Sequence, residues 1–182
     1  MICNPRRVGE LFRRAQAVRA ILFDIDGVFT DGYIIYDSEG REIKHFNCLD
    51  GQAIKMARLG GLKTGIISAR ESEAIRIRAR ELHIDGLRLG RHDKLAACRE
   101  LQKELNLREE EICFVGDDLP DIPVLERVGL PVAVANAAVA VKARCPFYTR
   151  REGGRGAIRE VVEFVLHARG ELESVVEQIA SP

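Results

Sequence analysis

The stretch "ILFDIDGVFTDG" at residues 21–32 joins an apolar run to a group of carboxylates, and it indicates both the fold and the place of a site. The run begins at about residue 18, and its apolar residues follow one another without alternating. Such a run predicts a strand that is buried on both faces, as in a parallel sheet. In an extended chain residues i and i+2 point to the same side, so Asp24 and Asp26 are expected to face one place where the strand ends.

Four more apolar runs predict further strands, at 62–68, 86–90, 111–116 and 130–135. The segments between them have helical periodicity, at 51–61, 71–83 and 93–106, and a last amphipathic helix follows the glycine-rich residues 151–160 and continues to about 168. Strands that alternate with helices over short connections predict an α/β fold, a doubly wound parallel sheet with helices on both faces.

One segment departs from this alternation. Residues 33–36 ("YIIY") and 42–46 ("EIKHF") flank the turn signal "DSEG", which predicts a protruding β-hairpin at about 31–47. A helix is expected at about 5–17, and residues from about 169 to 182 are expected to form a tail that frays or takes part in assembly. No linker or repeat divides the sequence, so a single domain over 1–182 is expected.

The composition excludes several classes of protein. The 182 residues are 46% hydrophobic and 31% charged, which is typical of a soluble globular domain. The 28 basic residues balance the 28 acidic ones, so no broad field would attract nucleic acid or an anionic membrane. Neither a membrane span nor an apolar signal core is visible, and a cytoplasmic location is expected. The five cysteines contain no CxxC pair, which argues against a disulfide framework and a zinc site.

Polar residues follow each of the first four predicted strands, at the edge of the sheet where ligands bind in such folds. In chain order they are Asp24 and Asp26, then Ser68 and Arg70, then Lys94, and finally Asp117, Asp118 and Asp121. Carboxylates this close could not all stay ionised without a cation. Oxygen ligands favour Mg²⁺, which usually binds through one or two carboxylates and a substrate phosphate. Lys94 and Ser68 offer donors for phosphate oxygens, so the pattern predicts a metal-dependent phosphoryl-transfer site.

Four motifs resemble those of the haloacid dehalogenase (HAD) phosphatase superfamily: "DIDGVFTDG", the hydroxyl after the second strand, the lysine before a helix, and "GDDLPD". The hairpin in place of a cap domain resembles the capless branch. Within that branch, "DGVFTDG", "DGQAI" and "GGRGAIRE" resemble phosphatases of 3-deoxy-D-manno-octulosonate 8-phosphate (Kdo 8-phosphate). The resemblance implies a HAD-like Rossmannoid fold and a Mg²⁺-dependent phosphomonoesterase that forms an aspartyl-phosphate while hydrolysing an acidic sugar phosphate.

The resemblance also implies roles for the matched residues. Asp24 matches the nucleophile, and Asp26 matches the acid that protonates the leaving group and then the base that activates water. The matched metal ligands are Asp24, the main-chain carbonyl of Asp26, and Asp117. Ser68 and Lys94 match the residues that hold phosphate, while Asp118 and Asp121 match those that orient metal-bound waters and Lys94.

Substrate-binding candidates also follow from the resemblance: Arg70, Thr30, Gly51 and Arg155. Arg70 could pair with the carboxylate of the sugar acid or cap the helix that follows. Thr30 lies in the first motif, where a role in a turn is equally open. Arg155 lies in "EGGRG", which could be a hinged flap or a plain loop before a helix. Ala69 replaces a glycine that the family usually has, so the local loop is expected to differ.

Assembly and three alternative functions stay open at this stage. The apolar hairpin residues suggest a partner surface, and the resemblance implies a homotetramer whose neighbouring subunits complete each site. The alternatives are a phosphatase of a nine-carbon sugar acid phosphate, a phospho-accepting receiver domain, and a non-catalytic module related to sugar-acid cytidylyltransferases. A receiver needs neither Asp26 nor a hairpin over the site, and the full set of acidic residues argues against lost activity.

Overall fold

A five-stranded parallel sheet forms the centre of the protein, in a computed structural model that describes residues 1 and 8–181. The strand order is β5-β4-β1-β6-β7, with β1 in the middle. In chain order the strands are β1 (Ala20–Phe23), β4 (Lys63–Ile67), β5 (Gly86–Arg88), β6 (Ile112–Gly116) and β7 (Leu130–Ala133). All four residues of β1 are fully buried, as the apolar run predicts for a central strand of a parallel sheet.

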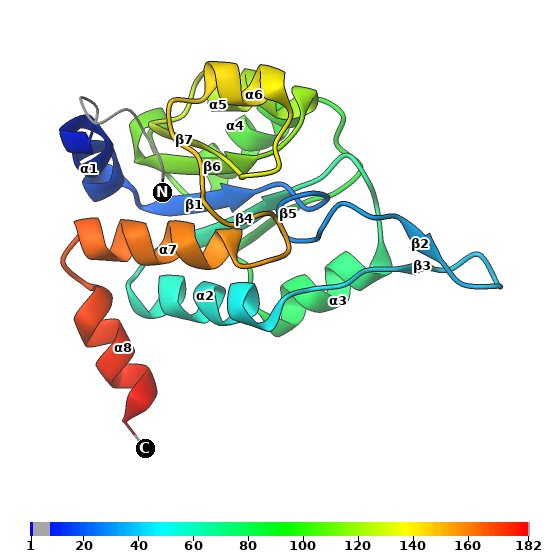
Figure 1. Cartoon of the computed structure of the whole chain (residues 1–182), viewed down its shortest axis with the longest axis horizontal. Helices are drawn as coiled ribbons and strands as arrows, with labels where there is room; N and C mark the ends of the chain where they lie inside the picture. Colours follow the sequence, from blue (N-terminus) through cyan, green and yellow to red (C-terminus); the bar gives the residue numbers. More distant parts are fainter. Residues whose placement is uncertain (2–7, 182) are drawn as a thin grey trace.

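Helices cover both faces of this sheet (Figure 1). On one face lie α2 (Cys48–Leu59), α3 (Glu73–Glu81) and α7 (Ala157–Ala168), with α1 (Val8–Ala17) packed beside α7. On the other face lie α4 (Lys94–Glu104), α5 (Ile122–Leu125) and α6 (Val139–Arg144), and the short 3₁₀ turns η2 (Glu109–Glu111) and η3 (Leu119–Asp121) flank β6. The doubly wound α/β fold predicted from the sequence is confirmed.

The start of α4 fixes where Lys94 lies. Asp93 is the N-cap residue, and its carboxylate accepts a hydrogen bond of 2.9 Å from the Ala96 N–H. Asp is a favoured N-cap because it satisfies a backbone donor that has no partner within the helix. Lys94 is therefore the first residue of the helix, and its side chain is buried at the sheet.

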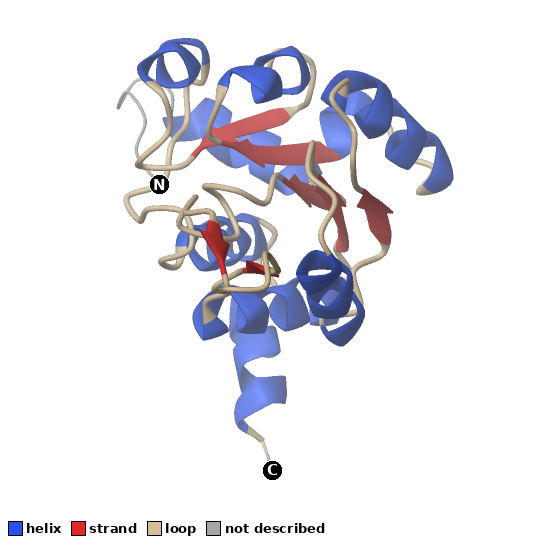
Figure 2. Ribbon diagram, turned by 90° about the vertical axis from the view of Figure 1, so that its right-hand side faces the viewer, coloured by secondary structure: helices blue, strands red, loops and turns tan. Residues whose placement is uncertain are grey.

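The predicted hairpin is present, and its paired part is short. β2 (Ile35–Tyr36) pairs antiparallel with β3 (Glu42–Ile43), and the ribbon projects beyond the carboxyl ends of the central strands (Figure 1). Figure 2 views the molecule from the side toward which the ribbon points. Asp37 closes the turn, because one of its carboxylate oxygens accepts hydrogen bonds of 2.9 Å from the backbone N–H groups of both Glu39 and Arg41. A two-stranded ribbon of this size is marginal by itself in water.

The chain termini differ partly from the sequence prediction. The tail expected from about residue 169 is instead a helix, α8 (Leu172–Ala180), which packs beside α7 and α2. Its Val175 is 1% exposed, and Arg169 donates a 2.6 Å hydrogen bond to the Val18 carbonyl just before α8 begins. This apolar contact and the anchored turn order a segment that was expected to fray or to take part in assembly, and the second possibility stays a prediction. At the other end α1 covers 8–17, while residues 5–7 of the expected helix lie outside the described residues.

No helix in the described part of the chain is long and apolar enough to cross a membrane. The cytoplasmic location stays a prediction.

Candidate active site

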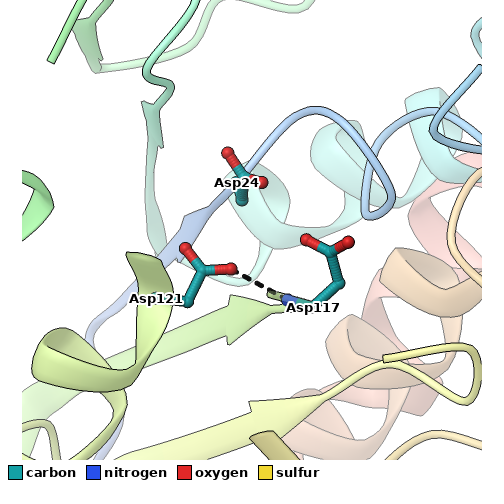
Figure 3. A group of neighbouring side chains, drawn as sticks. All are labelled: Asp24, Asp117 and Asp121. Atoms are coloured by element: carbon teal, nitrogen blue, oxygen red, sulfur yellow. Dashed lines mark hydrogen bonds between the residues drawn. The ribbon is translucent and has the colours of Figure 1, made fainter. Parts of the chain in front are cut away.

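Two adjacent strands bring together the carboxylates that the sequence places far apart. β1 and β6 are parallel neighbours, and Asp24 and Asp117 follow them directly, at the same edge of the sheet. Asp121 ends the 3₁₀ turn that comes after Asp117. One carboxylate oxygen from each of these three residues lies within 4.8 Å of the others, and Figure 3 shows the group beside the two strand ends. The predicted convergence of Asp24, Asp117 and Asp121 is therefore present in the structure.

Lys94 joins this group from α4. Its Nζ lies 2.9 Å from Asp24 Oδ1 and 2.6 Å from Asp121 Oδ1, and the residue is 5% exposed. The other oxygen of Asp121 accepts hydrogen bonds from the backbone N–H groups of Asp117 (2.9 Å) and Asp118 (3.2 Å). Both oxygens of Asp121 are thus occupied by donors, which suits a residue that holds Lys94 and the loop in place.

Burial and mutual repulsion change the titration of the cluster. Burial, and then the charge of Asp121, raise the pKa of Asp24 to about 6 even though Lys94 opposes the shift. Burial, and then the charges of Asp24 and Asp121, raise the pKa of Asp117 to about 8. Burial alone would lower the pKa of Lys94, but the two carboxylates outweigh it and raise that pKa above its ordinary value. The cluster is short of positive charge, so a cation would lower its free energy.

The geometry around Asp117 fits a metal ion. Its Oδ1 is buried and has no hydrogen-bond partner, a costly state for a carboxylate oxygen. Gly27, with a φ of 91°, passes so close that a Cβ there would collide with the Asp117 carboxylate. A set of carboxylate oxygens with one free buried ligand atom suits a hard divalent cation. Asp24 and Asp117 could supply side-chain oxygens, and the Asp26 carbonyl stays a predicted third ligand.

Ser68 and Thr30 are both buried, and they differ in what they contact. Ser68 follows β4, the neighbour of β1 on the other side, and its Oγ accepts a 3.2 Å hydrogen bond from the Arg70 N–H. It lies at the same sheet edge as Asp24, as predicted for a phosphate-holding residue. Thr30 Oγ1 donates to the Ile25 carbonyl at 3.4 Å and accepts from the Gly32 N–H at 3.3 Å. These two contacts support the turn role for Thr30.

Asp26 contacts the hairpin. Its Oδ1 accepts a 2.5 Å hydrogen bond from Lys44 Nζ, and Lys44 also lies 3.3 Å from Glu42. Lys44 was not among the residues predicted from the sequence, although the sequence carries a signal for it. In "EIKHF", Glu42, Lys44 and Phe46 have the i, i+2, i+4 spacing of one face of a strand, and that face turns out to be the inner one.

The remaining predicted residues lie around this centre or away from it. Arg70 donates to Glu42 (3.0 Å) and to the Tyr36 hydroxyl (3.3 Å), so it belongs to the base of the hairpin. Asp118 is exposed, and it is Asp121 that contacts Lys94. Gly51 is buried in α2, where a Cβ would collide with the Arg78 guanidinium. Gly51 therefore leaves room for the Arg78 side chain beside α2, and its predicted role in substrate binding stays a prediction.

The glycine-rich segment 152–156 is packed against the first motif. The Gly154 N–H donates a 2.9 Å hydrogen bond to the Val28 carbonyl, and a Cβ at Gly153 would collide with the Gly27 carbonyl oxygen. Asp50, fully buried at the start of α2, accepts 3.0 Å hydrogen bonds from the N–H groups of Gly156 and Arg159.

These contacts favour a fixed loop and helix start over a hinged flap. Arg155 is 64% exposed and pairs at 3.7 Å with Glu152, so this structure does not bring it to the carboxylate cluster.

The fold and the site together define a haloacid dehalogenase-like hydrolase, and the family model of that description matches residues 90–160. Among curated proteins, the Kdo 8-phosphate phosphatase KdsC of Escherichia coli K12 is 38% identical over 93% of this chain and 90% of its own length. The chain belongs to the family of 3-deoxy-D-manno-octulosonate 8-phosphate phosphatases.

Two solved structures agree with this assignment. A probable YrbI family phosphatase from Pseudomonas syringae has a TM-score of 0.92 and 45% identity, covering 96% of this chain and 99% of that one. The Kdo 8-phosphate phosphatase of Moraxella catarrhalis, solved with magnesium, phosphate and Kdo, also has a TM-score of 0.92, with 33% identity over 94% of this chain and 99% of that one.

Proposed function

We propose that this protein hydrolyses Kdo 8-phosphate to Kdo and inorganic phosphate, with Mg²⁺ as its cofactor. The observation that carries the proposal is the near full-length similarity to curated Kdo 8-phosphate phosphatases, in a chain that gathers Asp24, Asp117 and Asp121 at one edge of the sheet. The magnesium and phosphate bound to the Moraxella catarrhalis relative support the choice of metal and the class of substrate.

In the proposed reaction Asp24 is the nucleophile. Its carboxylate attacks phosphorus, the bond between phosphorus and the sugar oxygen breaks, and Asp26 donates a proton to that leaving oxygen. Asp26 then takes a proton from a water molecule, which attacks the phosphoryl group on Asp24 and releases inorganic phosphate. Lys94, held between Asp24 and Asp121, would balance the negative charge of the transferred group.

The metal site would be formed by Asp24, Asp117 and the main-chain carbonyl of Asp26. A bound Mg²⁺ would offset charge on the phosphoryl oxygens and on the carboxylates that burial has crowded together. The free buried Oδ1 of Asp117 supports its role as a ligand. Asp121 is less suited to direct ligation, because both of its oxygens already accept hydrogen bonds.

Arg70 stays the main candidate for recognition of the sugar carboxylate. It follows Ser68 at the carboxyl edge of the sheet, and its Nε is buried without a hydrogen-bond partner. A guanidinium can bind a carboxylate through two parallel hydrogen bonds, a pattern that separates acidic from neutral sugars.

The experiment that tests the function is a phosphate-release screen with purified protein and Mg²⁺. We expect kcat/KM for Kdo 8-phosphate to exceed that for neutral hexose phosphates by at least about tenfold, as one charge-assisted contact would give. A preference for a nine-carbon sugar acid phosphate would overturn the substrate, and absence of any phosphatase activity would overturn the function.

We also propose that the protein is a homotetramer in which the hairpin of one subunit overlies Asp24 and Asp26 of the next. The support is a group of exposed apolar side chains on and beside the hairpin, those of Tyr33, Ile34, Tyr36 and Ile43. A short ribbon that exposes such residues is typical of a surface that is covered by a partner.

A further inference from the structure

Lys44 has a buried ionisable side chain that lies outside the predicted site. It comes one residue after β3, in the strand of the hairpin that returns to the body of the protein. Its side chain is 1% exposed, although lysine is almost never this buried unless it is paired. The partners are Asp26 Oδ1 at 2.5 Å and Glu42 Oε1 at 3.3 Å.

The two carboxylate partners of Lys44 have different surroundings. Glu42 also pairs with Arg70, at 3.0 Å, so it is held by two cations within the hairpin base. Asp26 has one oxygen on Lys44, while its Oδ2 lies 3.9 Å from Arg70 Nε, beyond hydrogen-bond distance. The Asp26 side chain is 22% exposed. The pairing thus makes the two oxygens of Asp26 unequal: Oδ1 is bound by the ammonium group, and Oδ2 is not.

We propose that Lys44 is a positioning residue for Asp26, which fixes Oδ1 and leaves Oδ2 as the oxygen that exchanges the proton with the leaving group and with water. This inference rests on the acid and base role assigned to Asp26 above. Proton transfer needs the donor within hydrogen-bond reach of the leaving oxygen, so an acid that is free to rotate spends part of its time in useless orientations. A buried lysine that is itself held by Glu42 removes that freedom.

The ion pair between Lys44 and Asp26 also connects the hairpin to the proposed proton transfer. Glu42 and Lys44 lie on one face of the returning strand, and Asp26 lies in the loop after β1. Any displacement of the hairpin would move Lys44, and through it Asp26, while Asp24, Asp117 and Lys94 would keep their places on the sheet and α4. A defect in the hairpin is therefore expected to impair the proton transfer and to spare the attack on phosphorus.

The way in which kcat depends on the leaving group distinguishes a positioning role of Lys44 from a purely structural one. An alkoxide such as a sugar oxygen needs a proton when it leaves, whereas p-nitrophenolate does not. The Lys44→Met variant keeps most of the side-chain volume and loses the charge. We expect its kcat for Kdo 8-phosphate to fall about tenfold or more, relative to its kcat for p-nitrophenyl phosphate, within the range that general acid catalysis contributes.

Arg41→Met is the matched control. Arg41 lies at the tip of the same hairpin, pairs with Asp37 and Glu39, and is 70% exposed, so this variant also removes one positive charge from the ribbon. Its ratio of the two rates should stay within about twofold of the wild-type value. Lys44→Arg keeps a donor for Asp26 and should retain most of the ratio.

Two further variants keep the proposal falsifiable. In an Asp26→Asn background, Lys44→Met should no longer change the ratio, because no acid is left to position. If Lys44→Met does not fold, Glu42→Gln serves instead, since it removes the carboxylate that helps to hold the Lys44 ammonium group, and the ratio should fall by a smaller factor. An unchanged ratio in the folded variant, or the same loss in the Asp26→Asn background, would overturn the proposal. A wild-type enzyme that prefers other alkyl phosphates would overturn the substrate only, and those esters would then replace Kdo 8-phosphate in the comparison.

Discussion

The carboxylate of Asp24 lies in a crowded, buried environment in which a charge is useful to catalysis and costly to stability. Asn has nearly the same shape but no anionic oxygen to attack phosphorus. We expect Asp24→Asn to lower phosphate release by roughly 10⁴-fold or more, as removal of a nucleophile does in other hydrolases. Its thermal stability without metal should be retained or improved, because one of three repelling carboxylates is gone.

The matched control for this substitution is Asp37→Asn. Asp37 lies in the hairpin turn, where its side chain accepts hydrogen bonds from the Glu39 and Arg41 N–H groups. Asn serves equally well in such turns. This variant should keep activity within a few-fold of the wild-type value. Comparable turnover in Asp24→Asn and wild type would remove Asp24 from the role of nucleophile.

The raised pKa values of Asp24 and Asp117 make metal binding and stability depend on pH. The ordinary value is 3.8, and the folded values are about 6 and about 8, so the folded metal-free protein holds more protons than the unfolded chain between about pH 4 and 8. The contribution of these groups to stability is therefore lost as the pH rises through that window. We expect Mg²⁺ to raise the melting temperature more at about pH 8 than at about pH 5.5, and to release protons when it binds at the lower pH.

Thermal unfolding of Asp117→Asn provides the comparison. The variant lacks the group with the higher pKa, so its metal-free melting temperature should change less with pH than that of the wild type. A wild-type response to Mg²⁺ that does not vary with pH would contradict the linkage.

Individual side-chain roles were only partly visible in the sequence. Arg76, Arg78 and Arg80 alternate within the helix predicted at 71–83, and their spacing alone does not tell them apart. In the structure all three pair with glutamates, but only the Arg76 and Arg80 side chains are well exposed on α3. Arg78 is 24% exposed, and its guanidinium lies 5.9 Å from the centre of the Phe46 ring. Which arginine packs inward depends on the path of the hairpin over α3, a contact between distant segments that periodicity cannot reveal.

At the scale of elements, the glycine-rich segment before α7 acts as a support for the first motif. Gly153 leaves no room for a Cβ beside the Gly27 carbonyl, and Gly27 itself lies against Asp117. We expect Gly153→Ala to push the loop at 27–30 and lower kcat by about tenfold or more, since small misplacements in a catalytic loop are costly. Gly9→Ala is the control, because a Cβ at that position of α1 meets nothing within 4 Å.

Asp50 provides an independent test of the same support. Asp50→Ala would leave the N–H groups of Gly156 and Arg159 without their acceptor, at a cost of about 1–3 kcal/mol for a buried donor. Denaturant unfolding measures that loss. The reference is Asp93→Ala, which removes an exposed cap of α4 and should cost about 1 kcal/mol. Equal small losses in both variants, with kcat unchanged in Gly153→Ala, would show that the segment is not a support.

The strands that form the buried core were predicted well from the sequence. The strands of the sheet begin and end within a few residues of the apolar runs, because burial on both faces leaves a continuous apolar signal. The hairpin and its turn at Asp37 were located, but the paired part is shorter than "YIIY" and "EIKHF" suggest, because the pairing ends at Ile35 and Ile43 and leaves residues 33–34 and 44–46 outside the ladder. α8 was missed although Leu172, Val175, Val176 and Ile179 have the i, i+3, i+4, i+7 spacing of an amphipathic helix, a signal in the sequence that the expectation of a tail did not use.

On the scale of the whole molecule, the proposed site is formed by two groups of residues. Asp24, Asp117, Asp121 and Lys94 lie on the sheet edge and α4, and this group was predictable because each member follows a buried strand or starts a helix. The second group is Asp26, Lys44, Glu42 and Arg70. It connects that edge to a ribbon that projects from the domain and exposes apolar side chains. The second group therefore depends on whatever holds the hairpin in place.

Assembly is the simplest way to hold it, and a hairpin variant tests this. Tyr33 and Ile34 are 70% and 51% exposed, and Asp at both positions would place two charges in an apolar contact between subunits. We expect Tyr33→Asp with Ile34→Asp to yield smaller species in light scattering and to lose activity on Kdo 8-phosphate, with a smaller loss on p-nitrophenyl phosphate. The control, Ser38→Asp with Arg41→Gln, changes the net charge of the same hairpin equally and leaves its apolar surface intact. A folded monomer with undiminished activity on the sugar phosphate would refute the shared site, and a variant that stays tetrameric would refute the hairpin interface.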